Sequence, residues 1–325
     1  MMTQLHTWVR TRAVLLGWAA AFCMGPALAA GPDPGDTNGF DVGNASVPLS
    51  AIQRGGPPKD GIPAIDQPKF VGADQAGFLK DGDRVLGLVL GGEPRAYPVR
   101  ILNWHEVVND RFGKRAVLVS YCPLCGTGMA FEASDVAGDG QFGVSGLLYN
   151  SDVLLYDRAT HSLWSQIIGT AISGPRKGAR LQALPMTHTT WADWLRRHPK
   201  TRVLSDDTGL GRDYDRDPYA AYAAVPQLMF DVQHRDDRFP TKEWVLGIEV
   251  DGVAKAYPFS RLARAVNARG ELADRVNGKT VHIRFDAGSG SAEAFDAQRR
   301  ALPATMAYWF AWVAFHPRTE VLSAP

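Results

Sequence analysis

The sequence contains only three cysteines among 325 residues, and neither sign of charge is in excess. Its 35 basic residues are balanced by 34 acidic ones, whereas nucleic-acid-binding domains carry a basic surplus. Beyond residue 30, no stretch approaches the roughly 18 apolar residues of a membrane-spanning helix. Glycine-rich phosphate loops and the G-x-S-x-G elbow of hydrolases are also missing. We therefore expect no nucleic-acid partner, no nucleotide cofactor and no stable membrane span.

The N-terminus has the pattern of an export signal. Two arginines precede an apolar run over residues 13–24, and Ala27-Leu28-Ala29 provides the small residues of a cleavage site. We predict a signal peptide over residues 1–29, cleaved after Ala29, and a periplasmic or secreted protein. The mature chain then keeps only Cys122 and Cys125, in an oxidising compartment.

Three blocks of sequence occur twice in the same order, which indicates an internal duplication. "VLGLVLGGEPRAYPVRIL" recurs as "VLGIEVDGVAKAYPFSRL". In each copy, the spacing of apolar residues is typical of strands and of one short helix. The matched ranges are 85–102 with 245–262, 116–132 with 280–296, and 191–205 with 309–323. These blocks predict an α+β fold of two homologous mixed α/β repeats with β-rich cores, the second repeat degenerate and shortened.

The predicted organisation places function in the first repeat and gives the second a structural role. Residues 31–68 contain too much proline and glycine for a helix or a central strand, so we expect an extended arm there. The predicted segments are the signal peptide 1–29, the arm 30–83, repeat 1 over 84–206 with a functional insertion at 140–185, a linker loop 207–243, and repeat 2 over 244–325.

Only the first of the two matched regions carries cysteine. Cys122 aligns with Asp286 and Cys125 with Ser289, so the loop forms elsewhere without sulfur. A disulfide that closes so short a loop adds comparatively little stability, which favours a chemical role. Covalent haem attachment is excluded because Gly126 stands where the motif needs histidine. A complete zinc ribbon is excluded because the mature chain has no second cysteine pair.

The other candidates lie in an insertion of the first repeat and on the predicted helix that carries His105 and Glu106. Phe131 and Trp191 are 60 positions apart, whereas their counterparts Phe295 and Trp309 are 14 apart. The extra segment is dense in groups that can contact a substrate: Tyr149, Asn150, Asp152, Tyr156, Asp157, Arg158, Trp164 and Gln166.

From these residues we predict a metal or redox site on the "CPLCG" loop. The catalytic candidates are Cys122, Cys125, His105 and Glu106. The metal-ligand candidates are Cys122, Cys125, His105 and His161, with an oxygen ligand from Asp157, Glu106 or Tyr149. Thiolate with imidazole suits copper or zinc, and copper is the first expectation. The role would be that of an oxidoreductase or of a metal carrier.

Two other functions stay open at this stage. The cysteines can form a thiol-disulfide oxidoreductase, with Cys122 attacking and Cys125 resolving. The chain can also be a non-enzymatic module that binds a small molecule and uses the cysteines as a structural disulfide. The sequence leaves the substrate, the oligomeric state and the pathway open.

The motifs taken together resemble one known family. "DGIPAIDQPKF", "AYPVRILNWHEVVND", "VSYCPLCGTGMAF", "SGLLYNSDVLLYDRATHSLWSQ", "WLRRHPKTRVLS" and "TGLGRDYDRDPY" follow one another in this order. They are similar to the prokaryotic family catalogued as domain of unknown function 3179, over nearly the whole mature chain. The resemblance implies no settled activity. It implies that the block around Cys122 is a hallmark and that Cys125 is the less essential cysteine.

Overall fold

The computed structural model describes residues 36–136 and 139–323, and within them the chain is mostly β. Strands hold 39% of these residues and helices 13%. The predicted signal peptide, together with Cys23, lies outside the described residues. No helix in the described ranges has the length and apolar character needed to traverse a bilayer.

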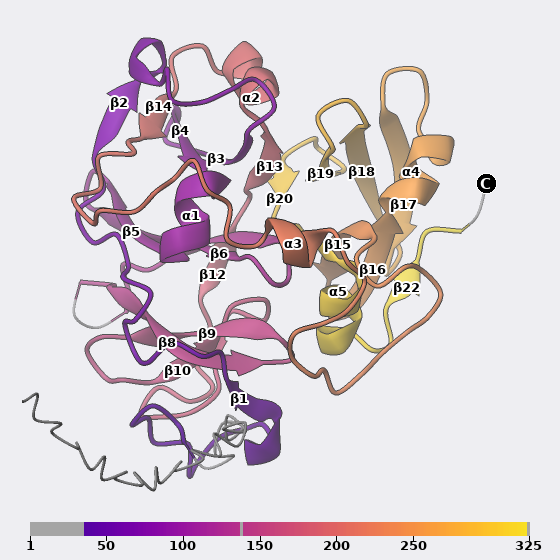
Figure 1. The fold of residues 1–325 in the computed structure, drawn as a ribbon. Coiled ribbons are helices and arrows are strands. Elements are labelled where there is room, and N and C mark those ends of the chain that lie inside the picture. The colour runs from indigo at the N-terminus through magenta and orange to yellow at the C-terminus, as the bar shows by residue number, and fades with distance from the viewer. Residues whose placement is uncertain (1–35, 137–138, 324–325) are drawn as a thin grey trace, which may run out of the picture. The chain divides into compact units, whose positions relative to one another are not determined.

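The strands form five small sheets arranged as a five-bladed β-propeller, and we refer to the sheets as blades A to E (Figure 1). Blade A has the order β1-β8-β9-β10-β11: β1 (Ile52–Arg54), β8 (Phe142–Tyr149), β9 (Asp152–Asp157), β10 (Leu163–Ser165) and β11 (Thr170–Ala171). Blade B has the order β12-β7-β6-β5: β5 (Val107–Phe112), β6 (Arg115–Cys122), β7 (Thr127–Glu132) and β12 (Gln182–Leu184).

The other three blades complete the ring. Blade C has the order β13-β3-β4-β14-β2: β2 (Phe70–Gly72), β3 (Arg84–Leu90), β4 (Glu93–Pro98), β13 (Thr187–Thr190) and β14 (Arg202–Leu204). Blade D has the order β21-β15-β16-β22: β15 (Trp244–Val250), β16 (Val253–Pro258), β21 (Thr305–Tyr308) and β22 (Glu320–Val321). Blade E has the order β17-β18-β19-β20: β17 (Glu271–Val276), β18 (Lys279–Asp286), β19 (Ser291–Asp296) and β20 (Ala301–Leu302).

The helices are short and connect strands. Four of them have seven residues each and follow a strand of blade C or D directly. The helices are α1 (Val99–His105), α2 (Trp191–Arg197), α3 (Ala220–Ala223), α4 (Phe259–Ala265) and α5 (Trp309–Phe315), and two 3-10 turns are η1 (Leu49–Ala51) and η2 (Ala73–Gln75).

Contacts between neighbouring blades close the ring in the order A, B, C, E, D. Asn109 of blade B donates its side-chain amide to the Phe142 carbonyl of blade A. Blades B and C share a buried apolar cluster, and so do blades D and E. Thr187 of blade C bonds the Glu293 carboxylate of blade E at 2.6 Å. Asn150 of the β8–β9 turn reaches the Ala314 carbonyl of α5, which joins blade D to blade A.

The prediction of an α+β fold of two mixed repeats, the second shortened, is wrong. Each set of matched sequence blocks is divided between two blades, C and B for the first set and D and E for the second. The segment without a counterpart supplies most of blade A, the fifth blade. The helical pattern in the sequence suggests more helix than the protein contains, because four of the helices span only about two turns each and α3 about one.

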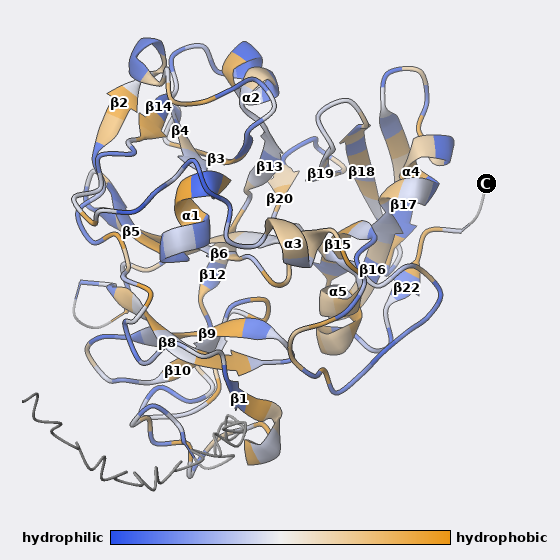
Figure 2. Cartoon of the chain, in the orientation of Figure 1, coloured by the Kyte–Doolittle hydropathy of each residue, from blue (hydrophilic) through white to orange (hydrophobic). Residues whose placement is uncertain are grey.

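The blades differ in how far they are buried. In β18, polar and apolar residues alternate, which leaves one face in solvent, and Figure 2 shows this alternation along the strand. In β8 and β9, almost every residue is buried, because blade A lies between the N-terminal arm and blade B. The candidate residues of the insertion are therefore mostly interior.

In blades C and D alike, a tryptophan ring packs directly on the backbone of a glycine in the neighbouring strand. A Cβ at Gly87 would lie 2.2 Å from the Trp194 ring, and one at Gly247 would lie 2.2 Å from the Trp312 ring. Each ring also stacks on the histidine that ends its helix, His198 at 4.1 Å and His316 at 3.9 Å between ring centroids.

We expect Gly87→Ala to destabilise the protein by about 1–3 kcal/mol, the range for overpacking a filled core. Gly82→Ala is the matched control, because a Cβ there meets no atom within 4 Å. Urea unfolding monitored by tryptophan fluorescence measures both changes. Equal stability of the two variants would contradict the close contact between Gly87 and Trp194.

Candidate metal and thiol site

The two cysteines lie at one end of a β-hairpin in blade B. Cys122 is the last residue of β6 and pairs with Thr127, the first residue of β7, so residues 123–126 form the turn. Gly126 has a φ of +67°, and a Cβ there would lie 2.6 Å from the Trp244 ring. Glycine is therefore required at this position both by the backbone conformation and by the close approach of blade D.

A second hairpin brings an oxygen-rich turn to the sulfur atoms. Asn150 and Ser151 join β8 to β9 and have positive φ values of 53° and 64°, the geometry of a tight two-residue hairpin turn. The Ser151 carbonyl lies 3.3 Å from the Cys125 Sγ and 3.9 Å from the Cys122 Sγ. Asp152 follows this turn directly. The sharp turn is what places a carboxylate beside the thiols.

Cys122, Cys125 and Asp152 form one compact group of ligand atoms. Their two sulfur atoms and one carboxylate oxygen all lie within 4.8 Å of one another, and all three residues are buried. Asp152 Oδ2 accepts a hydrogen bond of 3.1 Å from the Ile167 amide. Asp152 Oδ1 is buried with no hydrogen-bond partner among the described residues. This carboxylate oxygen is therefore free to bind an ion.

A second carboxyl group lies close to this group. Glu106 ends α1 in the left-handed conformation, with a φ of 56°, and its carbonyl accepts a hydrogen bond from the Tyr121 amide. Burial raises the pKa of Glu106 to about 8, and the nearby Asp152 charge adds to the shift. Burial also raises the pKa of Asp152 to about 7. In the absence of a cation, Glu106 is therefore mostly protonated near neutral pH, and Asp152 is about half protonated.

The two thiols are similarly reluctant to ionise. Burial raises the pKa of Cys122, and it raises that of Cys125 well above the usual range. No lysine, arginine or histidine is among the groups that shift the pKa values of these thiols or of the two carboxyl groups. Within the described ranges, the site therefore collects four acids in the interior without a basic partner.

The histidines predicted as ligands lie elsewhere. Both ring nitrogens of His105 already have oxygen partners, the Pro63 carbonyl at 2.8 Å and the Tyr214 hydroxyl at 2.6 Å. His161 is exposed in the β9–β10 turn, where its Nε2 lies 3.5 Å from Lys59 Nζ. Within the described ranges, the only group of three or more histidine, cysteine or acidic residues able to share one ion is the Cys122, Cys125 and Asp152 group.

Most of the predicted substrate-contacting residues are engaged in structural contacts. Asp157 accepts hydrogen bonds from Thr160 and from the Trp164 indole, and it thereby closes the β9–β10 turn. Four others have these partners: Tyr149 bonds Gln233, Asn150 bonds Ala314 and Gln233, Tyr156 bonds Asp60, and Arg158 pairs with Asp66.

Gln166 is the other predicted substrate contact near the thiols. Its amide nitrogen donates to the Ser120 hydroxyl and to the Thr127 carbonyl, on the two strands that carry the cysteine turn. Its Oε1 and the Ser151 hydroxyl are buried without partners in the described part of the chain. These unpaired oxygens add to the polar lining of the site.

No pattern in the sequence predicted the residues that cover the site. Residues 205–243, which we call the connecting segment, run from blade C to blade D and include α3 (Figure 1). Tyr222 in this segment is buried, and its hydroxyl donates to the Leu124 carbonyl within the cysteine turn at 3.1 Å. Lys242 lies 3.2 Å above the Tyr222 ring centroid and donates to the carbonyls of Val225 and Gln227. Tyr222 lies 97 positions from Cys125 in the sequence, so no local spacing links them.

Comparison with known proteins identifies the family. Residues 59–301 match the family described as "Protein of unknown function (DUF3179)". The chain belongs to this family. The match covers most of the chain and includes the cysteine turn, the β8–β9 turn and the connecting segment. Among curated proteins and among solved structures, no match was found.

The raised carboxyl pKa values have a consequence for stability. A group whose pKa is higher in the folded state stabilises that state at low pH, and this stabilisation is lost as pH rises through the folded pKa. For Asp152, the loss extends from its ordinary value near 4 to about 7. We expect metal-free Asp152→Asn to gain stability relative to the wild type between pH 5 and 8, by on the order of 2 kcal/mol, at 1.36 kcal/mol per pKa unit.

Chemical unfolding of both proteins in chelator at several pH values measures this difference. Comparing the two proteins cancels the titration of the histidines, which they share. A stability difference that does not change with pH would contradict the burial of an uncompensated carboxyl group at Asp152.

The cover of the site can be tested through thiol reactivity. Tyr222→Ala removes the ring over the cysteine turn, and we expect the metal-free thiols to react with Ellman's reagent faster by about tenfold or more, equivalent to about 1.4 kcal/mol in opening free energy. Val225→Ala is the control, because Val225 is exposed on the same segment. Equal reaction rates in the two variants would show that Tyr222 does not cover the thiols.

Proposed function

We propose that the protein is an exported metal-dependent enzyme whose metal ion is held by Cys122, Cys125 and Asp152. The proposal rests on one observation above all: these ligand atoms lie within 4.8 Å of one another in the interior, next to Glu106, without a basic partner. Burying ionised acids without a counter-charge is costly, and a bound dication supplies that charge. Asp152 Oδ1, which has no hydrogen-bond partner in the described part of the chain, is the carboxylate oxygen offered to the ion.

The ligand set favours zinc over the copper expected from the sequence. The argument for copper assumed a thiolate with an imidazole, and both candidate histidines have other partners. Two thiolates and a carboxylate belong to the usual ligands of zinc. Three protein ligands leave a fourth position for water or substrate, which is the pattern of catalytic rather than structural zinc. Copper in the purified protein would instead assign redox chemistry to the same ligands.

The other two functions receive less support. Thiol-disulfide exchange needs a thiolate of low pKa that a partner can reach, whereas both thiols are buried and their pKa values are raised. A purely structural disulfide would supply no positive charge to compensate the buried carboxyl groups of Asp152 and Glu106.

Metal analysis tests this function directly. The mature protein is purified from a periplasmic extract without affinity nickel or added metal, and elemental analysis is combined with thiol titration. We expect about one equivalent of zinc or copper in the wild type, from the single group of ligands found here. Cys122→Ser and Asp152→Asn should lose most of it, because each removes one of three ligands.

Asp286→Asn is the matched control. Asp286 ends β18 at the place in its hairpin that Cys122 has in β6, but it is exposed and outside the ligand group. This variant should keep the full metal content. A wild-type protein that contains no metal, with both thiols in a disulfide, would refute the proposed function.

A further inference from the structure

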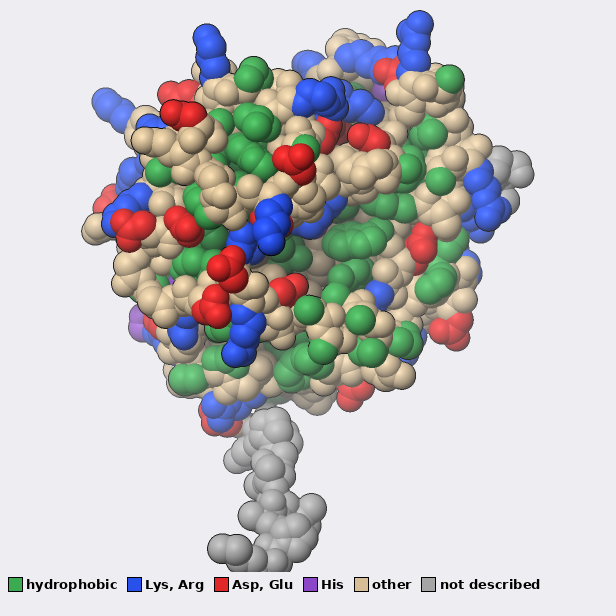
Figure 3. All heavy atoms as spheres, turned by 45° about the horizontal axis from the view of Figure 1, so that its top comes forward, with side chains coloured by type: hydrophobic (Ala, Val, Ile, Leu, Met, Phe, Trp, Pro, Cys, Tyr) green, Lys and Arg blue, Asp and Glu red, His purple; other side chains and the backbone are tan. Residues whose placement is uncertain are grey.

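One cavity of the protein is lined by a cation, Arg84, that forms no ion pair with another described residue. The cavity has a volume of about 550 Å³ and lies between blade C, α1 and the connecting segment. Its charged and amide side chains are Lys80, Asp83, Arg84, Arg100, Asn103 and the pair Asp215 and Asp217. Charged groups of both signs surround a hollow on the face of the molecule seen in Figure 3. The charge available to a ligand therefore depends on which of the groups are already paired.

Most of the charged groups that line this cavity are engaged. Arg100 forms ion pairs with Asp83 and Asp215. Asp217 accepts hydrogen bonds from the Asn103 amide at 3.1 Å and from the Tyr219 backbone at 2.8 Å. The three carboxylates thus have donors of their own.

Arg84 is the arginine of this cavity whose partners are all neutral, as the two donors to Asp217 also are. Its guanidinium donates to the carbonyls of His188 and Gly290 at 3.1 and 3.0 Å, and also to the Ser289 carbonyl. No carboxylate in the described ranges forms an ion pair with it. A guanidinium has five N–H donors, so these three bonds leave two donors and the whole positive charge without a partner. Burial lowers the pKa of Arg84, which reflects the same lack of a counter-charge.

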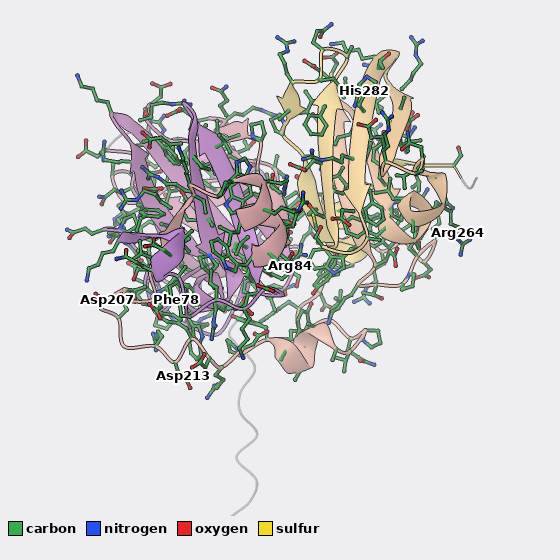
Figure 4. All side chains as sticks on the ribbon, turned by 90° about the horizontal axis from the view of Figure 1, so that it is seen from above. Phe78, Arg84, Asp207, Asp213, Arg264 and His282 are labelled. Carbon is green, nitrogen blue, oxygen red and sulfur yellow. The ribbon has the colours of Figure 1, made fainter. Side chains whose placement is uncertain are left out.

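Arg84 lies where the blades meet, and its neighbours lead to the strand that carries Cys122. Figure 4 shows it between the strands of blade C and those of blades D and E. The carbonyl of His188 accepts its hydrogen bond, and the His188 ring contacts Tyr121 edge-on at 6.1 Å between centroids. Tyr121 immediately precedes Cys122 in β6. His188 and Tyr121 therefore link Arg84 to β6, the strand that ends at Cys122.

We infer that Arg84 binds the anionic group of a small molecule, a carboxylate or a phosphate, in this cavity. Guanidinium recognises both groups through paired, charge-assisted hydrogen bonds. That the bound molecule is the substrate of the neighbouring metal centre rests on the proposed function. The binding of an anion at Arg84 does not depend on it. Lys80, which is exposed at the cavity rim, adds a second positive charge on the side of solvent.

The test is a calorimetric titration of the reduced, metal-free mature protein with sodium phosphate and, separately, with sodium acetate, at constant ionic strength. We expect saturable binding of at least one of these anions. Arg84→Gln should weaken it by about tenfold or more, because a hydrogen bond to a charged group contributes about 1.5–3 kcal/mol. Lys80→Gln, the rim control, should weaken it by less than about threefold, as expected for an exposed charge.

The two anions distinguish the kind of ligand. Tighter binding of phosphate would assign a phosphoryl group, and tighter binding of acetate would assign a carboxylate. Arg84→Lys keeps the positive charge but not the paired N–H donors. It replaces Arg84→Gln in the titration if Arg84→Gln does not fold. If neither anion binds saturably to the wild type, or if the folded Arg84 variant binds as tightly as the wild type, the inference is overturned. Because the titration uses metal-free protein, its result is independent of whether the purified protein contains metal.

Crystals of the wild type grown in phosphate locate the anion without any variant. Density for phosphate within hydrogen-bond distance of the Arg84 guanidinium is the expected result. An anion bound only at surface lysines would contradict the site.

Discussion

The burial of four acids without a basic partner is the constraint around which the site is built. Two thiols and the Asp152 carboxyl group share a volume small enough for one ion, and Glu106 lies close enough to raise the cost of ionising Cys122. Proteins rarely keep such groups in the interior unless a partner compensates them. The proposed metal ion would supply this compensation, and the raised pKa values describe the protein without it.

The fold supports this arrangement through turns rather than through long elements. The cysteine turn belongs to blade B, and the turn that carries Asp152 belongs to blade A. Blade D closes the site, since the Tyr308 amide donates to the Cys125 carbonyl at 2.9 Å and Trp244 lies against Gly126. The site is thus assembled from three blades. Because the turns of blades A and B meet and blade D packs against them, a ring of small sheets can position three ligands within a few ångströms.

Sequence reasoning found the cysteines because their loop is matched elsewhere in the chain by a loop without sulfur. It could also select the β8–β9 turn, since Asn150 and Asp152 stand between apolar strands, although it assigned Asp152 to the substrate rather than to the metal. It also placed His105 and His161 with the cysteines, whereas the structure does not bring these histidines to the thiols. Histidine is a common metal ligand, but the bonds of His105 to Pro63 and Tyr214 depend on tertiary contacts that no local pattern encodes. The fold class was missed because matched blocks show that two segments are similar without showing how many sheets each one forms.

The most direct test of the central claim is X-ray absorption spectroscopy at the metal edge of the purified mature protein. The account predicts two sulfur neighbours at about 2.3 Å and one or two lighter oxygen neighbours at about 2.0–2.2 Å, the distances of thiolate and carboxylate ligands to zinc. A first shell without sulfur would show that the ion binds elsewhere and that Cys122 and Cys125 are not its ligands.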